Sequence, residues 1–145
     1  MDDLAEIRAL IEERAAAIRD RDAARAVATL ADDLVAFELA PPLALGPDQA
    51  RDEAGLAAWL SGWDGPVGIE MRDLHIEAGG DVGWCRSLNR LHGTLKGGRK
   101  IDMWMRSTLA FRKEDGAWTI VHGHSSVPFL MDGSYRAAVD LSPEA

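Results

Sequence analysis

The second half of the chain consists of strand-like runs separated by very short turns. The runs lie near 67–78, 82–95, 100–112 and 117–127, and the sequences GGD, KGGRK and KEDG separate them. Short clusters of this composition are typical of β-hairpins, and strands joined by hairpins run antiparallel. The sequence therefore predicts an antiparallel meander, which must bury one of its faces against another layer.

Helical patterns precede this meander and can supply that layer. A first helix is predicted from Asp3, which forms a capping-box pattern with Glu6, and a second short helix from about Asp22 to the strand sequence LVAFEL. A third is predicted to start at Pro47. The first helix has apolar residues at helical spacing, namely Leu4, Ile7, Ile11, Ala15 and Ile18. Helices followed by a long curled sheet indicate an α+β fold, a cone-shaped sheet wrapped around N-terminal helices with a pocket between the layers.

Length and charge limit the classes of partner. The chain has 145 residues, 47% of them hydrophobic and 28% charged, which is typical of one soluble domain spanning 1–145. A formal net charge of -8 disfavours nucleic acid and anionic membranes as partners. No apolar stretch is long enough to span a bilayer and the first residues are acidic, so a cytoplasmic protein is expected. We expect an ordered core over about 3–130, then a tail whose first half packs back and whose end frays.

The segment WTIVHGHSSVPF contains two histidines within a strand pattern. Simple alternation places Trp118, Ile120, His122, His124 and Ser126 on one face. Because the two apolar residues belong to the core, the same face farther along would reach the pocket, where the histidines could contact a ligand. They could equally be structural histidines bonded to protein groups.

A metal site is a more specific alternative interpretation of this histidine pair. His122 and His124 could bind a metal ion if Glu38 or Asp102 supplied a further ligand. Two histidines satisfy only part of a coordination shell, so the sequence predicts no functional metal and no cofactor. Cys85, the only cysteine, is expected to be a buried and inert thiol.

The run 100–112 carries further candidates. Asp102, Trp104, Arg106 and Thr108 share one face, and a set rich in methionine occupies the other. A Trp and an Arg on an exposed sheet face suggest a homodimer interface, and the sequence favours the interface for Trp104 and Asp102. A bulge midway would instead turn Arg106 and Thr108 into the pocket, and the sequence favours the pocket for these two.

Two more residues are candidates for ligand contact. Asn89 alternates with the larger side chains of its strand, which makes it a small polar group inside the pocket. Trp63, at the end of the third predicted helix, can pack as a lid or stack on a ligand.

The chain resembles the SnoaL-like members of the nuclear transport factor two superfamily over nearly its whole length. The resemblance rests on the order of elements, on ADDLVAFELAPP, on a Gly-Gly-Asp turn, on a strand carrying Arg-Ser-Thr and on DGAWTIVHGHSSVPF. It implies a cystatin-like cone, and the superfamily includes polyketide cyclases, ketosteroid isomerases and dehydratases. One fold therefore serves several reactions.

The resemblance also suggests a catalytic carboxylate. In ketosteroid isomerases the proton-shuttling carboxylate lies on the first strand, a fixed step after an Ala-Asp-Asp, and the same step from Ala31 reaches Glu38. Alternation leaves two faces open for the core, one with Leu34, Ala36 and Glu38 and one with Val35, Phe37 and Leu39. The tyrosine and aspartate that hold the enolate oxygen in those enzymes fall near Glu12 and Thr108, so that oxyanion hole is absent.

The sequence therefore predicts a SnoaL-like pocket protein for a small apolar ligand with a carbonyl group. It would act without a cofactor as an isomerase, cyclase or dehydratase, and the alternatives are a non-catalytic ligand-binding protein or a dimerisation or docking domain. The predicted catalytic residues are Glu38, His122 and His124, and the predicted substrate-binding residues are Trp63, Asn89, Arg106, Thr108 and Ser126.

Overall fold

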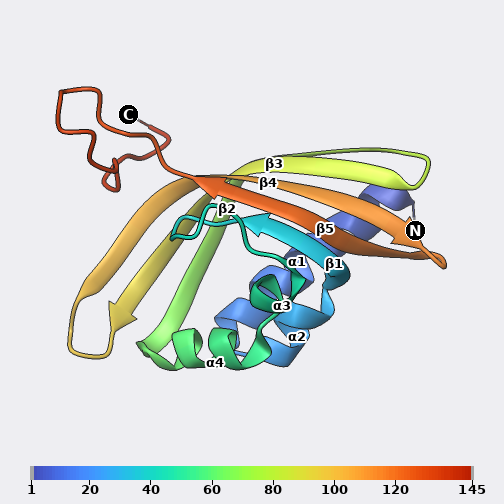
Figure 1. The fold of residues 1–145 in the computed structure, drawn as a ribbon, viewed down its shortest axis with the longest axis horizontal. Helices are drawn as coiled ribbons and strands as arrows, with labels where there is room; N and C mark the ends of the chain where they lie inside the picture. Colours follow the sequence, from blue (N-terminus) through green and yellow to red (C-terminus); the bar gives the residue numbers. More distant parts are fainter. Residues whose placement is uncertain (1, 145) are drawn as a thin grey trace.

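The computed structural model describes residues 2–144 and consists of N-terminal helices followed by a long sheet (Figure 1). The helices are α1 (Asp3–Arg19), α2 (Ala23–Ala28), α3 (Pro47–Ala50) and α4 (Glu53–Ser61). The strands are β1 (Leu30–Phe37), β2 (Trp63–Gly79), β3 (Val82–Leu95), β4 (Lys100–Glu114) and β5 (Ala117–Ser126). The predicted meander is confirmed, and β2 begins a few residues earlier than expected.

The strands form one open sheet in the order β1-β5-β4-β3-β2. Strand β1 pairs with β5 in parallel, and all other neighbours are antiparallel. The long strands β2, β3 and β4 bend at one end, so that the sheet curls around the helices (Figure 1). The predicted α+β fold, a curved and mostly antiparallel sheet around N-terminal helices, is confirmed.

The start of α1 differs from the predicted capping box. The side chain of Asp2 caps the helix by accepting a hydrogen bond from the backbone N–H of Ala5 at 2.8 Å. Asp3 instead accepts hydrogen bonds from Lys113 Nζ and Trp118 Nε1, both at 3.1 Å. These two hydrogen bonds therefore attach the first turn of α1 to the β4–β5 hairpin.

The third predicted helix is two helices. The chain leaves the helical conformation at Arg51, and Asp52 caps α4 by accepting a hydrogen bond from the Gly55 N–H at 3.0 Å. An N-cap side chain competes with continuation of the preceding helix, which explains the break. Trp63, predicted at the end of this helix, is the first residue of β2.

The core lies between α1 and the inner face of the sheet. On this face, Phe111 of β4 pairs with Ile120 of β5, and Cys85 of β3 pairs with Leu109 of β4. The buried residues of the larger cluster are Ile7, Ile11, Leu34, Cys85, Phe111, Trp118 and Ile120. A second cluster joins α2, α4 and β2 and consists of Ala23, Leu60, Trp63 and Val67. Burial raises the pKa of the Cys85 thiol to about 11.

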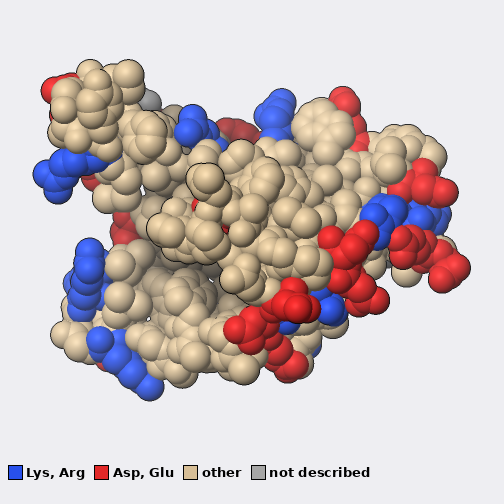
Figure 2. All heavy atoms as spheres, viewed as in Figure 1, with Lys and Arg blue, Asp and Glu red and all other residues tan. Residues whose placement is uncertain are grey.

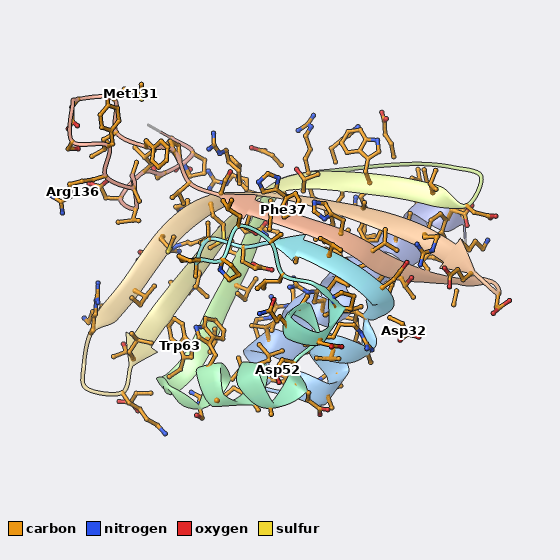
Figure 3. The ribbon with its side chains drawn as sticks, in the orientation of Figure 1. Asp32, Phe37, Asp52, Trp63, Met131 and Arg136 are labelled. Atoms are coloured by element: carbon orange, nitrogen blue, oxygen red, sulfur yellow. The ribbon has the colours of Figure 1, made fainter. Side chains whose placement is uncertain are left out.

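The C-terminal tail packs in the reverse of the predicted order. Its first half projects from the body, with Met131 near the tip (Figure 3), and Phe129, Met131 and Tyr135 are exposed. The following part returns, because Ala138 is buried and residues 140–144 reach the outer face of the sheet beside Trp104. The tail ends in an ion pair between Arg72 and Glu144. Among the described residues, no helix combines the length and the apolar composition needed to cross a membrane.

Candidate functional site

The inner face of the sheet is apolar at its curled end and has a few polar groups farther in. Strands β3 and β4 keep one register along their length, so alternation holds and their inward side chains can be assigned. The Oγ of Ser87 donates a hydrogen bond to Asn89 Oδ1 at 2.7 Å. Asn89 therefore lies inside, as predicted. The inward apolar residues beyond it are Leu91, Leu95, Ile101, Met103 and Met105.

The space under this end of the sheet opens to solvent. Figure 2 shows a hollow between the β1–α3 connection and α4, and most of the side chains around it are uncharged. Trp63 lies in the interior between α4 and β2 (Figure 3), and its ring meets Trp59 edge to face at 5.5 Å. Trp63 Nε1 is buried and donates to no acceptor in residues 2–144. Trp63 is thus a buried residue of the wall of the cone rather than a lid, and Trp59 is half-exposed beside it.

Glu38 follows the inward alternation of β1. Leu34 and Ala36 are each only 3% exposed, whereas Val35 is 39% and Phe37 is 37% exposed. The face with Leu34 and Ala36 is therefore the core face, and Leu34 packs there in one cluster with Ile7 and Ile11 of α1. Glu38 continues the inward set one residue past the end of β1, and it is exposed rather than enclosed.

Arg14 is a charged residue on the inward side of α1 that the sequence analysis did not single out. Arg14 lies on the same stripe of α1 as Ile7 and Ile11, and its side chain is half-buried. Burial lowers the pKa of Arg14, and the negative charge of Glu38 raises it in opposition. The sequence signal for Arg14 was a cationic residue three positions after Ile11 on the apolar stripe of the helix.

The guanidinium of Arg14 has no protein partner in the part of the chain that the structure describes. It donates no hydrogen bond there to another side chain or to a backbone carbonyl, and its half-buried position separates it from most of the surrounding water. An arginine stays protonated in proteins, and removing its charge from water is costly unless acceptors replace the water.

A β-bulge moves the histidine pair to the outer face of the sheet. Phe111 pairs with Ile120, but the next residue of β4, Ala110, pairs with His122, so Val121 is an extra residue in β5. One extra residue inverts the alternation that follows it. The prediction that His122, His124 and Ser126 share the face of Trp118 and Ile120 is therefore wrong.

Both histidines contact protein groups at the β1–β5 edge. Nδ1 of His122 lies 2.7 Å from the carbonyl oxygen of Val35, which accepts if this nitrogen carries the proton. The ring of Phe37 meets His122 at 4.7 Å and His124 at 5.4 Å, in edge-on geometry. His122 is half-buried and His124 is exposed, away from Glu38.

Arg106 and Thr108 also lie on the outer face. The β3–β4 register contains no bulge, and both residues alternate with the core residues Leu109 and Phe111. Arg106 Nε donates a hydrogen bond to Ser126 Oγ at 3.2 Å. The placement of Arg106 and Thr108 in the pocket, which needed a bulge midway along β4, is wrong because the bulge is in β5.

Other polar clusters lie away from Arg14. In residues 2–144, no three His, Cys, Asp or Glu side chains gather as they would around a metal ion. One open cleft of about 510 Å³ is lined by Asp32, Asp33, Arg51, Arg112 and Glu114, and these charges are largely paired with one another. A second cleft, of about 450 Å³, separates the tail from the outer face near Trp104. In both clefts, charged lining residues are held by ion pairs with one another.

Comparison with known proteins identifies the family. The family model described as SnoaL-like domain matches residues 7–130. The chain belongs to the SnoaL-like family. An NTF2-like protein of unknown function from Pseudomonas putida is 33% identical, with 99% of each chain covered and a TM-score of 0.83. A search of curated proteins finds no match.

More distant structures share the fold of this SnoaL-like chain. A ketosteroid isomerase-like protein from Erwinia carotovora is 22% identical, with 86% of this chain and 95% of that chain covered and a TM-score of 0.68. A candidate scytalone dehydratase from Novosphingobium aromaticivorans is 12% identical, with 85% and 82% covered and a TM-score of 0.74. At these identities the likeness establishes the cone but no reaction.

Proposed function

We propose that this SnoaL-like chain binds a small, mostly apolar carbonyl compound inside the cone, and that Glu38 acts there as a general base. The reaction would be a cofactor-independent isomerisation, cyclisation or dehydration. The observation that carries the proposal is that Glu38 continues the inward alternation of β1, toward an inner face of apolar side chains that also carries Asn89. A carboxylate at the edge of an apolar surface is a candidate proton acceptor for an apolar ligand bound there.

The roles of the inner residues follow from their positions. Leu91, Met103 and Met105 offer apolar contact, and Trp63 offers a ring face in the wall. Asn89 can bond a polar group of the ligand with its amide N–H, because its Oδ1 already accepts from Ser87. His122, His124, Arg106, Thr108 and Ser126 have no part in this proposal, since they lie on the outer face.

Exchange of carbon-bound protons tests the catalytic version. Wild-type protein in deuterated buffer should accelerate deuterium uptake next to the carbonyl of small ketones and enones, measured by NMR. Glu38→Gln should lower that rate by roughly a hundred- to ten-thousand-fold, as expected for loss of a general base, without changing the melting temperature. Glu12→Gln removes an exposed carboxylate from α1 and is the matched control.

The alternative is a protein that binds its ligand unchanged. The exposed position of Glu38 favours it, since an accessible carboxylate can serve as a simple polar contact. In that case the ketones would bind, as detected by thermal shift, but no variant would differ in exchange rate. Exchange at the uncatalysed rate in the presence of bound ketone would therefore rule out the catalytic version.

A further inference from the structure

The outward side chains in the middle of the sheet form a basic platform. It consists of three successive cross-strand rows of β3, β4 and β5, which are Trp84, Ala110 and His122, then Arg86, Thr108 and His124, then Leu88, Arg106 and Ser126. Directly paired residues point to the same face of a sheet, so all of these side chains face outward. None of them is acidic, although Asp and Glu outnumber Lys and Arg 24 to 16 in the chain.

The two arginines of the basic platform are left without a carboxylate. Arg86 and Arg106 are exposed diagonal neighbours on adjacent strands, about 7–8 Å apart. Within residues 2–144 neither forms an ion pair, and Arg106 Nε donates to the Ser126 hydroxyl at 3.2 Å, which leaves its charge uncompensated. The other arginines on this face are paired with carboxylates, namely Arg72, Arg90 and Arg112. Two like charges side by side favour a partner that brings negative charge.

The curled end of the same face has the opposite charge, and the C-terminal tail supplies it. This acidic end is the cleft of about 450 Å³ near Trp104, and its charged residues are Glu70, Asp102, Asp140, Glu144, Arg72 and Arg90. The strands alone contribute two carboxylates and two guanidiniums, which balance, and the tail adds Asp140 and Glu144. Asp140 is exposed and has no ion-pair partner in the described chain. The tail therefore changes this end from neutral to acidic.

We propose that the basic platform of one chain binds the acidic end of a second copy of this chain. Two sheets that pack outer face to outer face are related by a two-fold axis lying in the plane of the contact. An axis parallel to the strands would place platform on platform, where equal charges repel. An axis perpendicular to the strands places each platform on the other chain's acidic end, so the favourable contact is made twice.

This arrangement goes beyond a homodimer through the sheet and is independent of the proposed function. It fixes the orientation of the two chains, with their strands antiparallel, and it makes the tail part of the contact. The apolar area comes from Trp84, which is 39% exposed on the platform, and from Phe37, whose ring meets His124 at 5.4 Å. Charge complementarity selects the orientation, and aromatic burial supplies affinity.

Charge reversal with complementation tests the orientation. Arg86→Glu and Asp140→Arg each place like charges at both contacts of a dimer. Each variant alone should therefore raise the dimer dissociation constant roughly a hundredfold over wild type, measured by sedimentation equilibrium. An equimolar mixture of the two variants should recover the dimer, because the two reversed side chains then face each other at one contact and the native pair remains at the other.

Arg8→Glu is the matched control, since it makes the same charge change at an exposed position of α1 and should leave the dissociation constant unchanged. Salt should weaken the wild-type dimer by screening these exposed charges. Arg86→Gln, expected to weaken the dimer roughly tenfold, is a second variant if thermal melting shows that a reversal disturbs the fold. A monomeric wild type, equal dissociation constants for wild type and Arg86→Glu, or a variant mixture that stays monomeric would overturn the proposal.

Discussion

Arg14 and Glu12 are neighbours on α1 with opposite surroundings. Two residues along a helix correspond to roughly 200° of rotation, so one side chain faces the sheet and the other faces solvent. Glu12 is exposed, whereas Arg14 continues the stripe of Ile7 and Ile11. The resemblance to isomerases points to the exposed residue of this pair, whereas the helical periodicity of the chain places Arg14 on the inward side of α1.

At the same scale, Gly93 in β3 is a position where any side chain would clash. Its φ is +151°, and a Cβ there would lie 2.9 Å from the Pro66 carbonyl oxygen and 3.0 Å from the Trp63 ring. Gly93→Ala should therefore lower the free energy of unfolding by about 1–3 kcal/mol, measured by urea denaturation. Gly79→Ala is the control, because a Cβ at Gly79 meets nothing within 4 Å. Equal stabilities of the two variants would contradict the packing of β3 against Trp63.

At the scale of elements, strand β5 shows how one extra residue redirects a candidate site. Before Val121 the inward residues are Trp118 and Ile120, and after it the inward residue is Gly123, which packs beside Leu109. The sequence has a regular alternation through His124, and no local signal marks the bulge. Pairing with β4 on one side and with β1 on the other determines where the register shifts.

The fastening of α1 to the β4–β5 hairpin predicts a pH dependence of stability. Hydrogen bonds from Lys113 and Trp118 lower the pKa of Asp3 in the folded state. Because the folded pKa is below the unfolded one, this contribution is present above the unfolded pKa and is lost as pH falls through the folded pKa. Asp3→Asn should therefore be less stable at neutral pH and should lose less stability on acidification.

Urea denaturation from neutral pH to about pH 2 measures this difference. Asp48→Asn, at an exposed position of α3, serves as the control and should leave the slope of stability against pH unchanged. Parallel acid profiles for wild type and Asp3→Asn would show that the contact of Asp3 with the hairpin does not contribute.

For the whole molecule, the outer face of the sheet leaves apolar side chains in solvent. The side chains exposed on it are Val35, Phe37 and Trp84. The ring of Trp104 is partly covered, because Cζ of Arg72 lies 5.4 Å from the ring centroid and the returning tail lies beside it. We expect a homodimer through this face, as the sequence suggested with Trp104 and Asp102. Asp102 is already held by Arg90 in a two-bond ion pair, so its role would be to shape the surface.

Light scattering of the purified protein should give the mass of two chains at micromolar concentration. Phe37→Glu should shift the protein toward the monomer, because a charge would be buried at the contact, and Trp104→Glu should act less strongly because the tail shields that ring. Leu43→Glu, at a side chain 96% exposed in the β1–α3 connection, is the control. A monomeric wild type would contradict the expectation.

The sequence by itself determined the order of helices and strands and the curved sheet around the helices, but not the break between α3 and α4. Hairpin turns, helix caps and hydrophobic periodicity depend on a few neighbouring residues, so they can be predicted from the local sequence. Only the tertiary structure decided which polar side chains lie on the inner face of the sheet. Leu34 rather than Val35 faces the core because it packs against Ile7 and Ile11 of α1, and His122 faces outward because cross-strand pairing places a bulge at Val121. Both depend on contacts between segments far apart in sequence, which local patterns do not encode.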